Sequence, residues 1–324
     1  MEGTPELDCM ALSTLGLTSL SLIHIGFRNG DHLPPTLLDL HLEDSQPLPP
    51  PGLLTPIVRR LPALTSLRLD GLPFANPPSG ISCLTSMRQL GIYNNPELAT
   101  LGYIGGLHRL ERLTVHGCPA LEGLPASLSG LIGLHTLRIV DTSLPYVSPA
   151  LSALPALRCL TLGGTLLSLP AGLGALTGVE QLSLRYCHKL VDVGAMAGMT
   201  RLTHLEMGGC VAVSSLPPMP ALLVLNLNAT GWGVRQLPPL PSLVELEMHG
   251  CALERLPTRL STLTTLRRLR INYNRQLPVS ELEGLSALAC LTRLECQSCD
   301  FTVVPSWVAA AGVSCDLPIA EAHT

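Results

Sequence analysis

The segment LTVHGCPALEGLP, from Leu113 to Pro125, contains the pattern that decides the fold. Its first and third residues are apolar, its sixth is a cysteine, and a Leu-Pro pair closes it. The same arrangement of apolar residues and cysteine returns at Leu182, Leu205, Leu246 and Leu294. Because five cysteines recur at one point of a repeated pattern, their role must come from the repeat and not from a single reactive site.

The full repeat reads L-x-x-L-x-L-x-x-N and fits the chain thirteen times, most often 23 residues apart. Within each repeat the fourth and sixth residues are apolar, while the third, fifth and seventh mostly are not. This alternation predicts one short strand per repeat with one buried face. The repeats begin at Leu17, Leu37, Leu64, Met87, Leu110, Leu134, Leu157, Val179, Leu202, Leu222, Leu243, Leu266 and Leu291.

Most strands are followed by Leu-Pro and then by leucines three or four residues apart, as in residues 124–134. Proline has no N–H for a sheet, so it indicates a short-helix or irregular return. One such repeat cannot bury its own leucines and must stack on its neighbours, which predicts a solenoid whose parallel sheet lines the concave side. We expect this solenoid over residues 17–300, between an N-terminal cap at 1–16 and a C-terminal cap at 301–324. Its core should include Leu20, Leu22, Leu113, Val115, Leu160, Leu162, Leu205 and Leu269.

The ninth residue of each repeat should turn inward beneath the next loop and bond its backbone. Five of the eleven cysteines occupy this position, and most other repeats have Thr or Asn there. All three are small side chains with a hydrogen-bond donor, so we interpret these cysteines as structural, reduced thiols without metal. They are Cys118, Cys187, Cys210, Cys251 and Cys299.

Two segments depart from the repeat. SQPLPPPGLLTP, at residues 45–56, is rich in proline, which favours an extended surface loop over regular structure. The C-terminal segment predicts a short helix around Trp307 and then a last alternating stretch through Cys315 and Leu317, which together would cover the open end of the core.

The thirteen repeats resemble the leucine-rich repeat superfamily, which implies an α/β horseshoe with a concave parallel sheet of about thirteen short strands and short-helix or irregular convex returns. The C-x-x-L-x-x-L-P turn at Cys118 is similar to turns in plant intracellular repeat proteins and in the repeat region of plant disease-resistance proteins. Similar turns occur in some bacterial effectors delivered into plant cells. The resemblance implies a binding platform and does not name a partner.

Composition narrows the function classes. The net charge is −4 and the basic residues are scattered, which argues against nucleic-acid binding. No apolar stretch of about 18 residues predicts a membrane span, and the acidic start MEGTPELDC does not resemble a signal peptide. Eleven cysteines, an odd number spread over the chain, fit reduced thiols, so we expect a cytoplasmic protein.

Three motifs were considered for chemistry. The triplets HGC at His116 and His249 look like metal half-sites, but in this register the histidine faces solvent and the cysteine faces the core. CQSC, at residues 296–299, matches a redox or zinc motif, but Cys296 takes a core position and Cys299 the ninth position. No catalytic group or phosphate loop can be assembled from local motifs. We therefore expect no enzyme, cofactor, metal or small-molecule substrate.

Protein binding remains, through outward side chains of the concave sheet. Three of the five tyrosines fall at the seventh or eighth residue of a repeat, and Tyr and Arg often anchor interfaces. Repeats four to eight are the predicted contact surface. For Glu247, Arg270 and Glu295, lateral pairing between strands is an equal alternative. Another alternative is a fixed subunit that contacts a larger assembly through its edges and convex side. The candidate binding residues are Tyr93, His116, Arg138, Arg185, Tyr186, His249, Arg270 and Tyr273.

Overall fold

Every expected repeat contains a short strand in the computed structural model, which describes residues 6–44, 51–231 and 235–316. The chain divides into two compact units, Met1–Leu162 and Gly163–Thr324. In both units the strands are parallel, follow one another in chain order, and pair the same repeat positions side by side. The repeat register read from the sequence is therefore confirmed.

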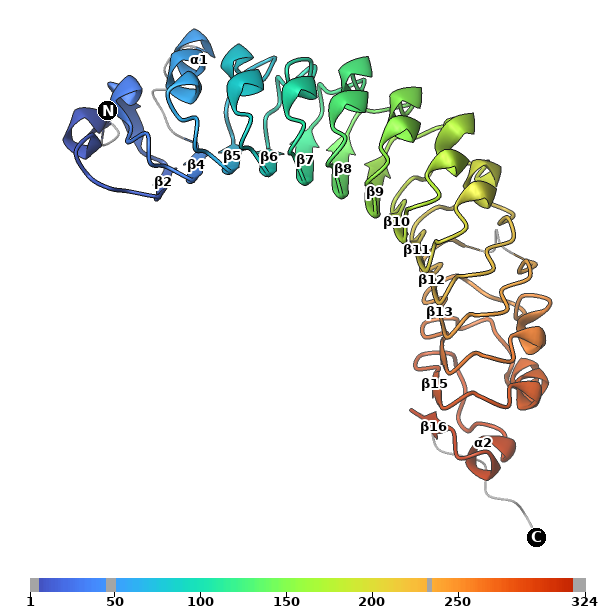
Figure 1. The fold of residues 1–324 in the computed structure, drawn as a ribbon. Coiled ribbons are helices and arrows are strands. Elements are labelled where there is room, and N and C mark those ends of the chain that lie inside the picture. Colours follow the sequence, from blue (N-terminus) through green and yellow to red (C-terminus); the bar gives the residue numbers. More distant parts are fainter. Residues whose placement is uncertain (1–5, 45–50, 232–234, 317–324) are drawn as a thin grey trace. The chain divides into compact units, whose positions relative to one another are not determined.

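The strands of the first unit are the longer ones. In the register, Leu67 lies beside Leu90, which lies beside Leu113, so the inward leucines form continuous rows. Figure 1 shows these strands side by side along one edge of the unit, with the returns on the other side. They are β2 (Ser19–Ile23), β4 (Asp39–Glu43), β5 (Ser66–Asp70), β6 (Gln89–Tyr93), β7 (Arg112–Cys118), β8 (Thr136–Thr142) and most of β9 (Cys159–Gly164).

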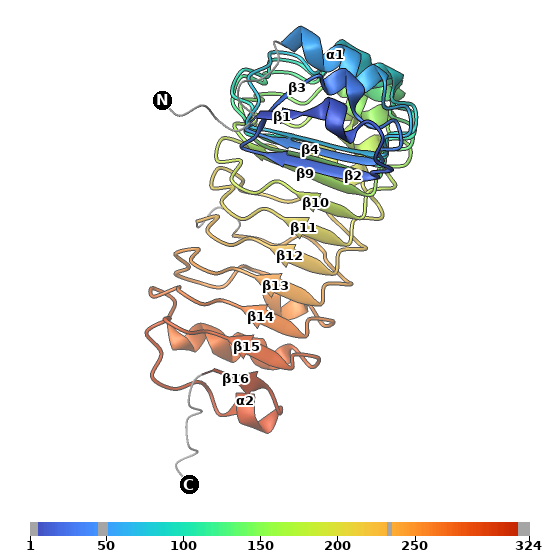
Figure 2. The same ribbon diagram turned by 90° about the vertical axis from the view of Figure 1, so that its left-hand side faces the viewer.

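The strands of the second unit are mostly three residues long. Figure 2 shows them in succession, each followed by its return. Leu205 pairs with Leu182 on one side and with Leu225 on the other, so the row of inward leucines is kept here too. The strands are β10 (Gln181–Ser183), β11 (His204–Glu206), β12 (Val224–Asn226), β13 (Glu245–Glu247), β14 (Arg268–Arg270), β15 (Arg293–Glu295) and β16 (Ser314–Cys315).

Short 3-10 helices form most of the returns, as the proline pattern predicts. Pro125, Pro170 and Pro278 each stand directly before such a helix, in extended backbone that suits their fixed φ. The helices of the returns are η3 (Ser79–Cys83), η4 (Ile104–Gly106), η5 (Ala126–Gly130), η6 (Pro149–Ala153), η7 (Ala171–Ala175), η8 (Gly194–Gly198), η9 (Leu260–Thr262) and η10 (Val279–Ala287).

Seven of the eight named core residues are buried as expected; Leu20 is only half-buried. Leu20 lies on β2, the terminal strand of the repeat sheet, and has a neighbouring strand on one side only. The N-terminal segment adds elements that the repeat pattern does not contain. They are a second parallel sheet of β1 (Glu6–Asp8) and β3 (Gly26–Arg28), with the 3-10 helices η1 (Cys9–Leu12) and η2 (Gly30–His32).

The expected loop at residues 45–56 is wrong in its second half, because a helix, α1 (Pro51–Arg59), begins there. Residues 45–50 lie outside the described part of the chain. Leu54, Ile57 and Val58 of the helix, and Leu61 just after it, recur at helical spacing and are buried, so packing of this face outweighs the hydrogen bond that Pro56 cannot make within the helix. The prolines of this segment therefore do not prevent a helix.

The ninth residue is buried in most of the described repeats, although Thr165 is exposed, and in several repeats it bonds the preceding repeat and not the next loop. Asn95 is fully buried; its Oδ1 accepts the N–H of Leu72 at 2.6 Å, and its Nδ2 donates to the Leu69 carbonyl at 3.3 Å. Cys210 Sγ donates in the same way to the carbonyl of Leu184 at 2.9 Å. All five cysteines at this position are buried, which confirms their structural placement.

The C-terminal segment contains the expected short helix and last strand. Helix α2 (Trp307–Ala310) is followed by β16, which pairs in parallel with β15, and Val308 and Val313 are buried between them and the last repeat. Leu317, the end of the predicted alternating stretch, lies outside the described residues. Within the part of the chain that the structure describes, no helix has the length and apolar character needed to cross a membrane.

Candidate partner-binding surface

The third, fifth and seventh residues of each repeat point away from the core and form what we call the sheet face. In the first unit, β5 to β8 enclose an open pocket of about 450 Å³ on this face. Its depth comes from small side chains at the third and fifth positions, since Gly91 has no side chain and the neighbours are Ser66, Thr114 and Thr136. Three arginines and a tyrosine stand around it: Arg68, Arg112, Arg138 and Tyr93.

One side of this pocket is built from mutually supporting contacts. The ring of Tyr93 lies across Gly91, where an added Cβ would come within 2.5 Å of Tyr93 Cε2. The guanidinium of Arg68 stacks on the same ring, 3.9 Å from its centre. Arg68 Nη2 also binds Asp70 Oδ2 at 2.7 Å, and the other oxygen of Asp70 accepts Asn94 Nδ2 at 3.0 Å. Arg68 and Tyr93 are therefore held in fixed orientations.

The other side of the pocket carries unneutralised positive charge. Arg112 and Arg138 are exposed, and within the described residues no carboxylate oxygen lies within 4.0 Å of either guanidinium. His116, a candidate from the sequence, contacts a carboxylate: its Nε2 lies 3.0 Å from Asp141 Oδ2. The centre of its ring lies 6.5 Å from that of Tyr93. The structure thus brings Tyr93, His116 and Arg138 onto one surface.

Arg68 and Arg112 belong to this surface, although they are not among the candidates from the sequence. Both occupy outward positions of the repeat, as do many other polar residues, so position alone could not distinguish them. The signal was available in Gly91, because a glycine at the fifth position opens a hollow between the side chains of the two neighbouring strands.

The second unit carries a separate cluster at Tyr186. Tyr186 is 55% exposed, the guanidinium of Arg185 lies 5.5 Å from the centre of its ring, and the ring centre of His188 lies 6.1 Å from that of Tyr186. Within the described residues, Arg185 has no carboxylate within 4.0 Å. Arg185 and Tyr186, both candidates, therefore form an exposed cation–aromatic pair.

Tyr186 and Tyr273 share an unusual backbone conformation. The eighth residue has a positive φ in all thirteen repeats, and here it is 61° and 63°. This left-handed conformation favours Gly, Asn or Asp, which occupy the position in repeats such as those of Gly71, Asn94 and Asp141. The two tyrosines therefore lie, at some conformational cost, in the exposed turns that follow β10 and β14.

Arg270 lies at the centre of an ion-pair network on β13 to β15. Its Nη1 binds Glu245 Oε1 at 2.9 Å and also Glu247, and its Nε lies 3.3 Å from Glu295 Oε2. Desolvation alone would raise the pKa of Glu295, but attraction and hydrogen bonding to Arg270 and hydrogen bonding to Arg293 lower it. The lateral pairing that the sequence offered as an alternative is present.

His249, beside this network, is half-buried and does not face open solvent as the register suggested. Burial lowers its pKa, so its neutral form is favoured. Its Nδ1 is buried and has no hydrogen-bond partner among the described residues.

Within each cysteine motif the potential metal ligands have different partners, as the register predicts. Cys118 is buried and its Sγ donates to the His116 carbonyl at 3.5 Å, while the imidazole of His116 bonds Asp141 on the sheet face. In CQSC, Cys299 Sγ donates to the Ile271 carbonyl at 3.1 Å, whereas Cys296 approaches Cys315. Burial raises the pKa of Cys118, Cys251 and Cys299, which makes these thiols poor nucleophiles.

Comparison with known proteins agrees with this architecture. The family model described as a leucine-rich repeat region matches residues 91–303. Two curated proteins of Arabidopsis thaliana are similar: Protein SUPPRESSOR OF npr1-1, CONSTITUTIVE 1, 29% identical over 60% of this chain, and Disease resistance protein RPS4B, 27% identical over 47%. The matched region is only 14% and 13% of the length of these relatives.

A solved structure, an internalin (inlF) from Listeria monocytogenes, is similar in fold. The TM-score is 0.64 at 19% sequence identity, and the match covers 92% of this chain and 86% of the internalin. The family model covers well over half of the 324 residues and coincides with the repeats observed in the structure. The chain belongs to the leucine-rich repeat family.

Proposed function

We propose that the chain is a non-enzymatic binding module that holds another protein on its sheet face, with the pocket of β5 to β8 as the main anchor. The observation that carries this proposal is that two arginines without carboxylate partners line the same pocket as a fixed tyrosine. Arg112 and Arg138 have no carboxylate within 4.0 Å among the described residues, and the tyrosine is Tyr93. Leucine-rich repeat proteins are commonly interaction modules, because a row of short strands presents many independent outward positions.

The charge of the pocket indicates the chemistry of the partner. Arg68 is neutralised by Asp70, so Arg112 and Arg138 supply the uncompensated charge. Guanidinium groups bind carboxylates and phosphates through paired hydrogen bonds, and a tyrosine ring supplies apolar contact area beside them. We therefore propose that the partner presents an acidic segment whose side chains enter this pocket.

In the second unit, Tyr186, Arg185 and Tyr273 are the candidate contacts. Tyr186 and Tyr273 are 55% and 63% exposed, which leaves their rings accessible to a partner. Arg270 has a smaller part in this proposal, because three carboxylates already surround it.

Three further assignments remain proposals. We propose that residues 17–300 act as the solenoid, capped by 1–16 and 301–324. We also propose a cytoplasmic protein, which the cysteine count favours. One relative is called a disease resistance protein, so a role in recognition within such a pathway is a reasonable extension. Because the match is confined to a small part of that protein, its whole activity is not transferred.

Affinity purification from the native source, followed by mass spectrometry, tests the binding surface. Three baits are compared: the unaltered protein, a pocket variant with Arg112→Gln and Arg138→Gln, and a control with Arg59→Gln and Arg109→Gln. The control makes the same change in charge at two exposed arginines outside the strands of the same unit. Circular dichroism confirms that all three baits are folded.

We expect a partner that the unaltered and control baits recover and the pocket variant does not. The affinity of the recovered partner should also fall with increasing salt, since each contact is between opposite charges. Equal recovery by all three baits would overturn the pocket assignment and favour the alternative of a fixed subunit bound through its edges and convex side.

A further inference from the structure

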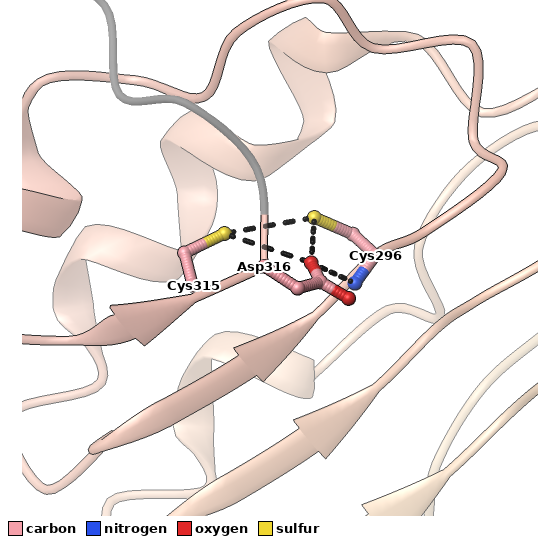
Figure 3. A group of neighbouring side chains, drawn as sticks. All are labelled: Cys296, Cys315 and Asp316. Carbon is pink, nitrogen blue, oxygen red and sulfur yellow. Dashed lines mark hydrogen bonds between the residues drawn. The ribbon is translucent and has the colours of Figure 1, made fainter.

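Three potential metal ligands meet at the C-terminal cap, outside the proposed partner-binding surface. Cys296 follows β15 on its inward side, and Cys315 and Asp316 lie on and directly after β16. The Sγ atoms of the two cysteines are 3.8 Å apart, and Oδ1 of Asp316 lies 3.5 Å from Cys296 Sγ and 4.0 Å from Cys315 Sγ (Figure 3). The three ligand atoms point toward one another around a common centre.

These three distances resemble the edges of a tetrahedral zinc site. Zinc binds thiolate sulfur at about 2.3 Å and carboxylate oxygen at about 2.0–2.2 Å. At a tetrahedral angle, these bond lengths place two sulfurs about 3.8 Å apart and a sulfur and an oxygen about 3.5–3.7 Å apart. Two of the three edges therefore agree with the ideal values, and the third is only a few tenths of an ångström longer.

The backbone holds the carboxylate in this position. The N–H of Cys296 donates to Asp316 Oδ1 at 3.0 Å, so the oxygen nearest the sulfurs is already oriented, as outer hydrogen bonds orient ligands in metal sites. The burial of the ligands is graded, since Cys296 is fully buried, Cys315 is half-buried and Asp316 is exposed. A fourth ligand can therefore reach the site from solvent on the Asp316 side.

The other group of potential metal ligands in the described residues is less suitable. It consists of His41, Glu43 and Asp70 on β4 and β5. The guanidinium of Arg68 already binds Asp70 at 2.7 Å and supplies positive charge there, so a metal cation would be repelled. Among the described residues, no ion pair joins a cation to the cap cluster, and its two sulfurs suit a thiophilic metal.

We propose that Cys296, Cys315 and Asp316 bind one zinc ion, with water as the fourth ligand, and that this ion fastens β16 to β15. The strand β16 is two residues long and pairs with β15 through only two positions, so its backbone contacts alone hold it weakly. A metal that binds only the folded arrangement stabilises it, because metal binding free energy becomes folding free energy. The C-terminal end of the core would then stay covered.

This site differs from the CQSC motif at residues 296–299, which resembles a zinc motif in its spacing alone. The CQSC spacing would make Cys296 and Cys299 ligands of one metal, but Cys299 Sγ donates to the Ile271 carbonyl of the preceding repeat. The partners of Cys296 come from a strand about twenty residues later, which no local motif could indicate. The expectation that the five ninth-position cysteines carry no metal is independent of this proposal.

Cobalt(II) is the probe for a direct test. Metal-free protein is prepared with a chelator and reductant and then titrated with Co²⁺ under argon. Two thiolates in a tetrahedral site give a sulfur-to-cobalt charge-transfer band and intense visible bands, and added Zn²⁺ should abolish them at one equivalent. We compare the unaltered protein with Cys296→Ser, Cys315→Ser and Asp316→Asn, and with Cys290→Ser, which removes an exposed cysteine elsewhere in the same unit, as the control.

We expect the bands in the unaltered and Cys290→Ser proteins, their loss in both ligand-cysteine variants, and binding at least tenfold weaker in Asp316→Asn. Zn²⁺ should also raise the melting temperature of the unaltered protein and not that of Cys315→Ser. Since Cys315 is half-buried and Asp316 is exposed, these two variants should fold even if Cys296→Ser does not. Circular dichroism checks this.

Two results would overturn the proposal. One is the absence of thiolate–cobalt bands from the unaltered protein, or their persistence in Cys315→Ser. The other is a count of nine free thiols in place of eleven when the protein is purified and denatured without reductant, with peptide mapping that assigns a Cys296–Cys315 disulfide.

Discussion

Replacement of Asn274 by alanine should destabilise the second unit strongly, because one buried side chain satisfies several backbone groups. Asn274 Oδ1 accepts the N–H groups of Cys251 at 3.0 Å and Leu253 at 3.2 Å. Its Nδ2 donates to the carbonyls of Met248 at 2.9 Å and Ile271 at 2.6 Å. Asn274 is fully buried, so water does not replace these bonds in the folded protein.

The magnitude follows from the two N–H groups. A buried donor without an acceptor costs about 1–3 kcal/mol, so two of them cost about 2–6 kcal/mol, and we expect a loss of about 4 kcal/mol in the free energy of unfolding. The matched comparison is Cys299→Ala at the same position of the next repeat. Cys299 is equally buried, but its thiol has only one proton to donate, with the Ile271 carbonyl at 3.1 Å and the Gln297 carbonyl at 3.8 Å as acceptors, so its removal should cost about 1 kcal/mol.

Urea unfolding followed by circular dichroism measures both variants against the unaltered protein. The expected difference between them is about 3 kcal/mol, a large fraction of the stability of an ordinary domain. If Asn274→Ala and Cys299→Ala lose the same free energy within about 0.5 kcal/mol, the ninth residue acts by filling space, and our account of it as a backbone hydrogen-bonding residue is incorrect.

Three further predictions concern stability. Cys210→Thr should lower the free energy of unfolding by less than about 1 kcal/mol, because a hydroxyl can donate to the Leu184 carbonyl. Cys210→Asp should lower it by more than about 4 kcal/mol, because it places a charge in a buried position. Similar melting temperatures for the two variants would contradict this. Tyr186→Asn should leave stability unchanged or raise it by up to about 1 kcal/mol, because asparagine tolerates the φ of 61°; a clear loss in urea unfolding would show that the ring stabilises the fold. Glu295 has a lowered pKa when folded, so its contribution is present above its ordinary value of 4.5 and is lost as pH falls through the folded pKa. The stability difference between the unaltered protein and Glu295→Gln should therefore be constant from about pH 7 to 5 and narrow as the pH falls below about 4.5, and a difference that is the same at every pH at which the protein can be unfolded reversibly would count against the ion-pair account.

The repeat strands could be predicted because their signal is local and is repeated thirteen times. Leu113 and Val115 alternate with outward residues, and each repeat tests the same register again. Helix α1 was missed because two kinds of local information conflict in it. Its prolines favour a loop, whereas the spacing of Leu54, Ile57 and Leu61 favours a helix, and only contact with the core decides between them.

The candidate surface was predicted less completely, because it depends on contacts between repeats. The sequence places Tyr93 and Arg138 on the sheet face, and Gly91 marks a missing side chain, but the pocket itself exists only where the neighbouring strands lie beside Gly91. The cluster of Cys296, Cys315 and Asp316 was missed for the same reason, since it arises from the pairing of β16 with β15. The role of an inward residue is set by packing in every repeat, so it can be predicted from the pattern. The role of an outward residue depends on which side chains lie beside it on the neighbouring strands.

The strained backbone at the eighth position distinguishes Tyr186 from Tyr273 as candidates for contact with a partner. A bulky residue in the left-handed region is destabilised by about 1–2 kcal/mol, and neither Tyr186 nor Tyr273 offsets this by burial, since both are more than half exposed. For Tyr186, contact with Arg185 at 5.5 Å supplies about 0.5–1 kcal/mol in return. Tyr273 has neither a ring contact nor a cation over its ring among the described residues. Its conformation is therefore not compensated within the described chain, which makes Tyr273 the stronger candidate of the two for direct contact with a partner.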